Sequence, residues 1–391
     1  MNHLNIAIDA LSARSGGGVT YLRNLIKALH DIGGKDRYLV FVTEGYADEV
    51  VTFESDRIKI ISIASHRIAN RILYEQLIMP ILLIRFKIDV LFAPAEVAPI
   101  LSKIPMLLGI QNLNVYESSE VSWPLYHKLR FFGLRILARL SAAKAGRVIF
   151  LSEYSRSIIS PTLRVPNHKT QVVSHGVDRK TFFNHKTKTL GTPPSFSDVE
   201  NPLKLVNGRH YILCVSDVDL HKNQAVLINA YARLSMELRR KHQLLIVGRL
   251  IDPYHEYLRN LVDRLNLGEY VALVGEYPHE DMPLIYSHAT VSVFPSLVET
   301  FGLPIIESMA CGVPVVAADN SAIPEVVGDA GVLFNPEDPD DLAMVLEDIL
   351  TKEDYRRNLL EKGLKRADQF SWNGAAEAIH QCLLDVTEVR D

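Results

Sequence analysis

Cysteine is scarce in this sequence. The 391 residues include three cysteines, Cys214, Cys311 and Cys382, and no two of them are spaced as a pair. Their scatter excludes a disulfide framework or a zinc finger and is typical of reduced thiols inside a cell. The formal net charge of −4 excludes a general electrostatic attraction to nucleic acid.

Long apolar runs are also missing. The longest, residues 77–84, contains Pro80 and is followed by Arg85. It is far shorter than the roughly 20 residues that a membrane-spanning helix needs. Residues 1–8 lack the basic start and long apolar core of a signal peptide. We therefore expect a cytoplasmic protein whose contact with a membrane, if any, is peripheral and at the inner face.

Strand-like segments alternate with helical ones in both halves of the chain, and a polar segment, 184–208, separates the halves. This alternation predicts a parallel sheet with helices on both faces in each half. The expected strands are 4–8, 38–43, 58–63, 90–93, 106–110, 147–151 and 171–174, then 211–215, 243–247, 270–273, 291–294 and 315–318. The expected helices are 20–29, 68–86, 224–238, 254–265 and, with a break near 371–374, 340–391.

The predicted fold class is therefore α/β, with two doubly wound Rossmann-like domains. An apolar fraction of 48% is ordinary for such a protein, and the length fits two domains of roughly 150 residues or more. We expect the domains at 1–185 and 205–372, with a C-terminal helix at about 373–391 that packs back on the first. Ligands of such sheets bind at the carboxyl ends of the strands, so facing domains would share a central cleft.

Two carboxylates flank the expected start of a helix in the second half. Phe294 ends a strand, Glu299 lies in the loop that follows, and Pro304 suits the first turn of a helix that carries Glu307. The amides of residues 300–303 would point outward at the positive end of this helix, which is suited to bind phosphate. Alternatively, the two carboxylates merely complement the helix dipole.

Several motifs of the second half resemble, in order and spacing, the nucleotide-sugar domain of the retaining glycosyltransferases of family 4, which have the GT-B architecture. The first half is similar more loosely, through the glycine loop and segments 74–76 and 152–155. The matching segments of the second half are His175-Gly-Val-Asp178, Lys222-Asn223, Val247-Gly248, Glu299-Thr-Phe-Gly302 with Glu307, 310–316 and 324–331.

The resemblance implies a donor site in the second domain. Lys222 would bind the donor diphosphate, Glu307 the ribose diol, and Glu299 the hydroxyls of the transferred sugar, because ionised carboxylates are hydrogen-bond acceptors. For Lys222 taken alone, a solvated surface lysine is the alternative. The implied donor-binding residues are Gly17, Gly18, Ser216, Lys222, Asn223, Gly248, Arg249, Glu299, Thr300, Phe301, Gly302, Leu303 and Glu307.

Catalytic groups follow from the same resemblance. They are Glu299, Lys222 and His175, although a lone histidine is often structural. The glycines at 16–18 would close on the donor phosphates from the first domain. Without the resemblance, they fit a flexible turn, because they do not form the full dinucleotide-binding pattern.

One departure from the family pattern concerns the phosphate clamp. Ser216 and Asp217 stand where many members have Gly-Arg, so the second cation is missing from its usual place. Either His221 or Arg249 would have to replace it.

A second departure concerns the acceptor side. Gln111 and Asn112 stand where many members have a His-Asp pair. An amide cannot act as a base near neutral pH. We still expect Asn112, together with Gln111 and Glu96, in the acceptor or sugar site.

No metal or other cofactor is expected. Two Asp-x-Asp strings, 217–219 and 338–340, could hold Mg²⁺ on a diphosphate. However, Asp338 and Asp340 precede a helix and are typical of turn and cap residues. The resemblance implies that Lys222 and helix amides replace the metal.

Residues 123–151 carry six basic side chains and no acidic one, interleaved with apolar and aromatic residues. Such a helix can lie on an anionic membrane surface, at 123–147, and the same composition fits a partly buried helix with a solvated edge. Our hypothesis is that this helix and 68–86 face a lipid-linked acceptor. The six basic residues are Lys128, Arg130, Arg135, Arg139, Lys144 and Arg147.

The resemblance thus implies a retaining hexosyltransferase that uses a nucleoside diphosphate sugar such as GDP-mannose. Mannose or a related hexose or deoxyhexose is favoured, and the acceptor would be a glycan, often lipid-linked, of bacterial O-antigen, lipopolysaccharide or another surface polysaccharide. Two alternatives stay open. One is a nucleotide-sugar epimerase or hydrolase on the same architecture, and the other is a non-catalytic sugar-nucleotide-binding protein.

Overall fold

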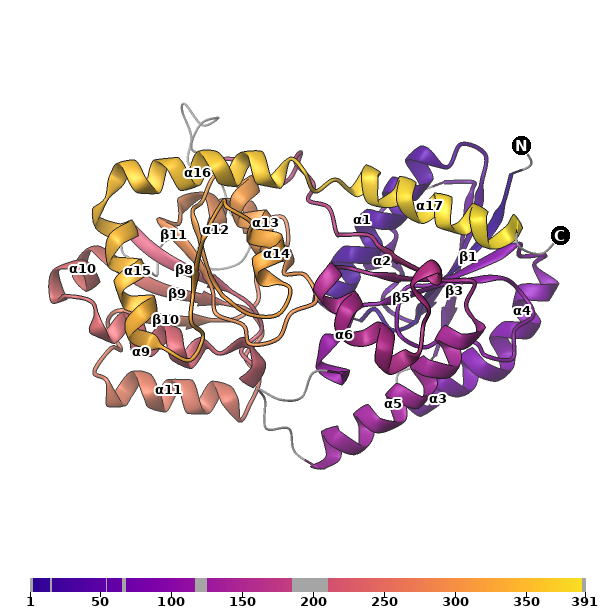
Figure 1. The fold of residues 1–391 in the computed structure, drawn as a ribbon, viewed down its shortest axis with the longest axis horizontal. Helices are drawn as coiled ribbons and strands as arrows, with labels where there is room; N and C mark the ends of the chain where they lie inside the picture. Colours follow the sequence, from indigo (N-terminus) through magenta and orange to yellow (C-terminus); the bar gives the residue numbers. More distant parts are fainter. Residues whose placement is uncertain are drawn as a thin grey trace. The chain divides into compact units, whose positions relative to one another are not determined.

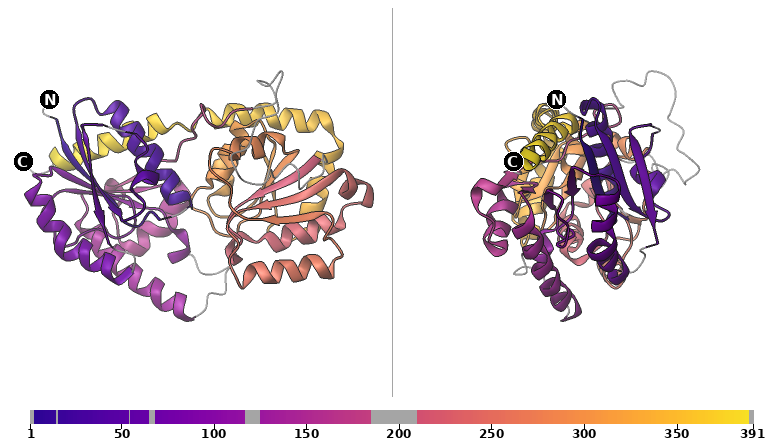
Figure 2. Two further views of the ribbon diagram at one scale, coloured as in Figure 1. Left: turned by 180° about the vertical axis from the view of Figure 1, so that it is seen from behind. Right: turned by 90° about the vertical axis from the view of Figure 1, so that its right-hand side faces the viewer.

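The computed structural model describes residues 3–14, 16–53, 55–64, 68–116, 125–184 and 210–388. The chain forms two compact units, Met1–Gly176 with Ser371–Asp391, and Val177–Phe370. Each unit is built around one parallel sheet with helices on both faces (Figures 1 and 2). Apart from Asn184, the expected linker at 184–208 lies outside the described residues.

The first unit contains a seven-stranded sheet in the order β3-β2-β1-β4-β5-β6-β7. Its central strand β1 pairs on both sides, so that Ile6 lies opposite Tyr38 of β2 and Val90 of β4. The inner strands are almost wholly apolar and buried, as expected where helices cover both faces. The strands are β1 (Asn5–Ala10), β2 (Arg37–Thr43), β3 (Ile58–Ile63), β4 (Val90–Ala93), β5 (Met106–Ile110), β6 (Arg147–Phe150) and β7 (Thr170–Val172).

The helices of the first unit come from both ends of the chain. The last helix, α17 (Trp372–Glu388), lies beside α1 and against β4 and β5 (Figure 1). The remaining helical segments are α1 (Gly16–Ile32), α2 (Ala47–Val50), α3 (Ile68–Leu73), η1 (Tyr74–Ile78), α4 (Met79–Arg85), η2 (Leu113–Val115), α5 (Leu125–Lys144), α6 (Glu153–Leu163) and η3 (Asn167–Lys169).

The second unit contains a six-stranded parallel sheet in the order β10-β9-β8-β11-β12-β13. Its strands are β8 (His210–Val215), β9 (His242–Val247), β10 (Val271–Val274), β11 (Val291–Phe294), β12 (Val315–Ala318) and β13 (Val332–Phe334). Its helical segments are η4 (Leu220–Lys222), α9 (Gln224–Arg233), α10 (Met236–Lys241), α11 (Tyr254–Arg264), α12 (Met282–His288), α13 (Leu303–Ala310), α14 (Ile323–Val327), α15 (Pro339–Thr351) and α16 (Glu353–Ala367).

Each sheet contains one point at which the strand order reverses. In the first unit it lies between β1 and β4, and in the second between β8 and β11. The connections on either side of such a point run to opposite faces of the sheet and leave a crevice at the carboxyl ends of the two strands. The predicted doubly wound α/β class is confirmed, and these two points are where ligands are expected.

The helix expected over 68–86 is interrupted. α3 continues into the π-helical turn η1 and then into α4. Pro80 lacks an N–H and cannot bond to the carbonyl of Gln76. The backbone hydrogen bonds of the helix change their spacing instead. The Met79 amide donates to the carbonyl of Tyr74, five residues earlier, which is π-helical spacing.

Two other expected helices are divided. The segment 224–238 separates into α9 and α10, because Leu234 is extended (φ −60°, ψ 148°) and the Ser235 side chain caps the new helix. Lys352 is also extended and separates α15 from α16. The strand β13, of three residues, and the helices α2, α6, α12 and α14 were not predicted from the sequence.

Gly248 follows β9 at the carboxyl edge of the second sheet. Its φ is +151°, and a Cβ built on it would lie 2.1 Å from the carbonyl oxygen of Ser216, the residue after β8. The ends of β8 and β9 can approach this closely only because residue 248 has no side chain.

Gly248→Ala is therefore expected to destabilise the second unit. A strained backbone position costs about 1–3 kcal/mol, and the Ser216 loop would also be displaced. Urea denaturation measures the loss, with Gly268→Ala as the matched control, because a Cβ at Gly268 meets nothing within 4 Å. Equal midpoints for the two variants would contradict this account of the β8–β9 edge.

Candidate functional site

Lys222 and Glu299 form an ion pair at the reversal point of the second sheet. Lys222 ends η4, which follows β8, and Glu299 lies in the loop after β11. The Lys222 ammonium donates to Oε1 of Glu299, and the two side chains are only 18% and 12% exposed. The two loops are also joined through the backbone, because the Leu297 amide donates to the carbonyl of His221 at 2.8 Å. A cation and a carboxylate are thus held together in the predicted crevice.

The start of α13 lies directly after this pair. Gly302 caps the helix with φ +99° and supplies no side-chain cap, and Pro304 lies in the first turn. A Cβ on Gly302 would lie 3.0 Å from Ile305 and 3.3 Å from the ring of Phe294, so the loop is tightly packed here. Thr300, Phe301 and Leu303 surround this helix start, as the sequence predicts. A helix start without a capping side chain is suited to an anion.

Glu307 lies further along α13 and keeps partial solvent access. The hydroxyl of Tyr286, on α12, donates to its Oε2 at 3.0 Å. Desolvation by the surrounding protein raises the pKa of Glu307 to about 7, and the Tyr286 hydrogen bond opposes this less strongly. Near neutral pH the side chain is therefore divided between a neutral acid and an anion that only accepts hydrogen bonds.

Arg249 is one candidate for the second cation of the phosphate clamp. It pairs with Asp217, which stands at the position where that cation is missing. Its guanidinium donates to Asp217 at 2.7 Å. Ser216 is held in turn, since Gln224 Nε2 donates to its hydroxyl at 2.8 Å and to the carbonyl of Asp217 at 2.8 Å. The arginine therefore lies at the Ser216–Asp217 loop, but a carboxylate neutralises much of its charge.

Asn223 supports the lysine loop. It adopts a left-handed conformation (φ +55°), and its side-chain amide donates to the carbonyl of Pro336 at 2.9 Å. The side chain thus ties η4 to the loop after β13. Its predicted contact with the donor stays a prediction.

The Asp-x-Asp strings have structural partners. Asp338 caps α15, accepting from the amides of Asp340 and Asp341 at 2.8 and 3.2 Å, as the sequence predicts for a cap. Asp219 accepts from the Leu220 amide and lies 3.6 Å from His221 Nδ1. Among the described residues, no group of three or more His, Cys, Asp or Glu side chains is placed to hold a metal ion. Metal independence itself stays a prediction.

His175 lies in the first unit within an aromatic cluster. Its ring centroid is 4.7 Å from that of Tyr21 on α1 and 5.7 Å from that of Trp372 on α17. Burial lowers the pKa of His175 to about 3, so the imidazole is neutral at physiological pH. Packing against these two rings is enough to account for a histidine at this position. Its catalytic role stays a prediction.

Glu96, Gln111 and Asn112 are brought together at the carboxyl ends of β4 and β5. Oε1 of Glu96 accepts from the amides of Gln111 at 3.0 Å and Asn112 at 2.6 Å. Glu96 and Asn112 line a cavity of about 610 Å³. Other polar residues of this cavity, among them Asp9, Arg71 and Glu75, were not predicted as site residues from the sequence. Only the loose likeness of segment 74–76 to the family pointed there.

The sequence predicts a loop at Gly17 and Gly18. In the structure both residues lie in the first turn of α1. A Cβ built on Gly17 would meet nothing within 4 Å, so this turn is open on that side. Their role toward the donor stays a prediction.

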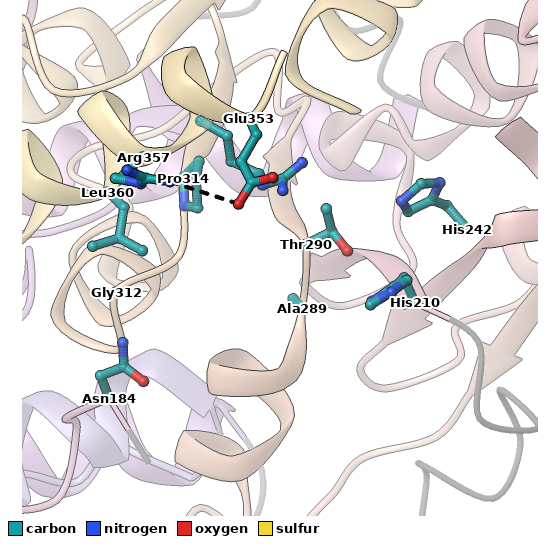
Figure 3. Close-up of a pocket in the computed structure, with 11 residues that line it drawn as sticks. Asn184, His210, His242, Ala289, Thr290, Gly312, Pro314, Glu353, Arg357 and Leu360 are labelled. Carbon is teal, nitrogen blue, oxygen red and sulfur yellow. Dashed lines mark ion pairs between the residues drawn. The ribbon is translucent and has the colours of Figure 1, made fainter. Parts of the chain in front are cut away.

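A further cavity, of about 290 Å³, lies in the second unit (Figure 3). His210 and His242 begin β8 and β9, and their rings stack with centroids 5.6 Å apart. Thr290 and Pro314 directly precede β11 and β12, and Glu353 of α16 completes the wall. The cavity is thus at the amino ends of the strands, the edge opposite Lys222 and Glu299, and it is distinct from the crevice at the β8–β11 reversal point.

Comparisons with known proteins show which family the chain resembles. Residues 15–181 match the family described as "Glycosyltransferase Family 4", and residues 196–366 match "Glycosyl transferases group 1". The chain belongs to glycosyltransferase family 4. Among curated relatives, it is 37% identical over 265 residues to O-antigen chain mannosyltransferase B of Escherichia coli. That alignment covers 66% of this chain and 65% of the relative's length.

Solved structures show the same fold. Sucrose-phosphate synthase of Thermosynechococcus elongatus superimposes with a TM-score of 0.79 at 22% identity, covering 99% of this chain and 100% of that one. HepE of Anabaena, in complex with UDP and glucose, gives 0.77 at 19% identity, covering 98% and 100%. These likenesses confirm the predicted GT-B fold.

The raised pKa of Glu307 makes the stability of the protein depend on pH. The ordinary value is 4.5 and the folded value about 7, so the folded state favours the protonated form. The stability that this group contributes is present below pH 4.5 and is lost as the pH rises through about 7. Between pH 5 and 8, the wild type should lose about 1–3 kcal/mol more stability than Glu307→Gln.

Urea denaturation of both proteins at the two pH values measures this difference. Glu347→Gln, which changes an exposed carboxylate of α15 in the same unit, serves as the control and should follow the wild type. If the wild type and Glu307→Gln respond to pH in parallel, the burial argument for Glu307 is wrong.

Proposed function

We propose that this chain is a retaining, metal-independent glycosyltransferase. It transfers mannose or a related hexose from a nucleoside diphosphate sugar to a glycan acceptor. The observation that carries the proposal is the placement of Lys222, Glu299 and the start of α13 together at the β8–β11 reversal point. Membership of the family and the likeness to an O-antigen mannosyltransferase support the reaction class and the sugar.

The geometry supports separate roles for Lys222, Glu299 and Glu307 in binding the donor. A diphosphate at the start of α13 would take the Lys222 ammonium from Glu299, replacing one anionic partner by another. Glu299, released from the ion pair, would then accept hydrogen bonds from hydroxyls of the transferred sugar. The anionic form of Glu307, supported by Tyr286, would accept from the ribose diol.

In the proposed reaction, the bond between the anomeric carbon and the diphosphate oxygen breaks, and the acceptor oxygen bonds to the same face of that carbon. The departing phosphate takes the acceptor proton, as the resemblance implies, so that no protein base is needed. Lys222 and the α13 amides stabilise the negative charge that develops on the phosphate. His175, buried and neutral, is not required as a base in this scheme.

The acceptor in this proposal is lipid-linked. α5 and the α3–α4 segment line the same cavity, and each carries a row of exposed apolar side chains. Rows of this kind are typical of surfaces that contact lipid or a partner. No helix of the described ranges is long and apolar enough to cross a membrane. The rows are Leu125, Tyr126, Leu129, Phe132, Ile136 and Leu140 on α5, and Leu73, Leu77, Ile78, Ile81 and Ile84 on the other segment.

We expect the protein to bind donors with one nucleobase more tightly than donors with the others. In a thermal-shift screen of UDP, GDP, ADP and dTDP sugars, the preferred donor stabilises the folded state by mass action, about 2.7 kcal/mol at 100 times its Kd. Lys222→Gln should lose this shift and reduce turnover by about 10²–10³-fold. A chelator should leave the turnover of the wild type unchanged.

Lys241→Gln is the matched control for that screen, because Lys241 is an exposed lysine of the same unit, paired with Glu237. Each variant is compared with its own midpoint without ligand. Full turnover in Lys222→Gln, or no shift with any nucleotide sugar, would contradict the proposal. Rapid release of free or epimerised sugar without an acceptor would favour a hydrolase or epimerase.

The membrane contact has its own test. The triple variant Lys128→Glu/Arg139→Glu/Lys144→Glu reverses exposed charges of α5, and it leaves Arg135, which donates to the carbonyl of Val115, in place. It should lose binding to vesicles of phosphatidylcholine with phosphatidylglycerol, and salt should weaken binding of the wild type. Lys27→Glu/Lys35→Glu/Arg37→Glu, on other exposed positions of this unit, is the control. Equal binding by the two triple variants would rule out the contact through α5.

A further inference from the structure

The cavity of the first unit lies at the β1–β4 reversal point. Asp9 is the penultimate residue of β1, and Glu96 and Asn112 follow β4 and β5, so the strand ends supply a polar floor. Leu134 and Leu137 of α5 supply an apolar wall. The volume of about 610 Å³ is within the usual range of small-molecule sites.

Glu75 differs from the other residues of this cavity. Its side chain is almost wholly enclosed, with 3% of the residue exposed. Oε1 pairs with Nε of Arg71 at 3.2 Å, while Oε2 has no hydrogen-bond partner among the residues that the structure describes. A buried carboxylate oxygen without a partner is costly to fold. Its place in a cavity wall points to a partner from outside the chain.

The local structure fixes Glu75 in this position. It lies in the π-helical turn η1, a feature common at functional sites. The neighbouring side chain, Gln76, clamps that turn to the segment after β4. Its Nε2 donates to the carbonyl of Ala98 at 2.9 Å, and its Oε1 accepts from the amide of Ile100 at 2.9 Å.

Asp9 lines the same cavity as Glu75, and the charges of the two side chains interact. Burial raises the pKa of Asp9, and burial together with the charge of Asp9 raises the pKa of Glu75, against the opposing effect of Arg71 and Arg14. The two carboxyl groups therefore hold a proton more readily than isolated ones do. A protonated carboxyl group both donates and accepts hydrogen bonds, as does a sugar hydroxyl, whereas a phosphate would add negative charge beside Asp9, Glu75 and Glu96.

We propose that the Asp9–Glu75 carboxyl pair binds hydroxyls of the acceptor's terminal sugar, a neutral pyranose whose ring carbons contact Leu134 and Leu137. This inference rests on the proposed transferase function and names the sugar subsite of its acceptor. Both carboxyl groups are positioning residues, because they fix which acceptor hydroxyl faces the donor.

The test uses octyl α-D-mannopyranoside, which joins a pyranose to an apolar tail. Glu75→Gln keeps the shape of the side chain and an oxygen for Arg71, and Asp9→Asn keeps the acceptor for the Leu11 amide. Saturation-transfer NMR on the wild type should show transfer to the ring protons of the sugar. Both variants should bind at least about tenfold more weakly, which corresponds to about 1.4 kcal/mol. Glu49→Gln, on the exposed surface of α2, should bind as the wild type does.

A second measurement separates this inference from the proposed function. Nucleotide-sugar binding and donor KM should be unchanged in Glu75→Gln, while acceptor KM rises. Wild-type affinity for the pyranoside in both variants, or no binding to the wild type, overturns the inference even if transferase activity is found. Sugar binding that depends on Glu75, without turnover of any nucleotide sugar, supports the inference and overturns the function. If Glu75→Gln does not fold, Asp9→Asn decides by the same readouts.

Discussion

The reversal of strand order in each parallel sheet is the constraint on which the rest of the molecule depends. At the β8–β11 boundary it brings Lys222 and Glu299 together from segments far apart in the sequence. At the β1–β4 boundary it does the same for Asp9 and Glu96. Connections that diverge to opposite faces of a sheet leave a crevice that short loops do not fill. Each unit thus has one such crevice, and the residues that line the two crevices differ in their chemistry.

Charge distinguishes the two crevices. The second unit presents a lysine and the amide end of α13, which together favour an anion, beside carboxylates that can accept hydroxyl hydrogen bonds. The first unit presents more carboxyl groups than cations, which suits neutral hydroxyl groups instead. Keeping the pairs Lys222–Glu299 and Arg71–Glu75 largely out of water costs desolvation free energy that an apolar pair would avoid. The ligand binding proposed for both crevices would account for these pairs better than stability does.

Most of the fold could be predicted because the inner strands are short apolar runs between turn residues, and their bounds are recovered to within a residue or two. The carboxylate and the helix start after β11 were also predictable, since Glu299, Gly302 and Pro304 lie close together in the sequence. Features that depend on distant partners were not predictable. The Asp217–Arg249 pair joins the ends of two strands, and the enclosure of His175 depends on ring contacts with Tyr21 and Trp372, which are far from it in the sequence. The role of Pro80 in shaping η1, and so in burying Glu75, appears only with the hydrogen-bond ladder in view.

A crystal structure with an intact nucleoside diphosphate sugar bound tests the central claim most directly. The account predicts the diphosphate at the start of α13, with the Lys222 ammonium moved from Glu299 to a phosphate oxygen, and Glu299 within hydrogen-bond distance of a sugar hydroxyl. A diphosphate bound away from the β8–β11 reversal point, or a Lys222–Glu299 ion pair that remains intact beside the bound donor, would contradict it.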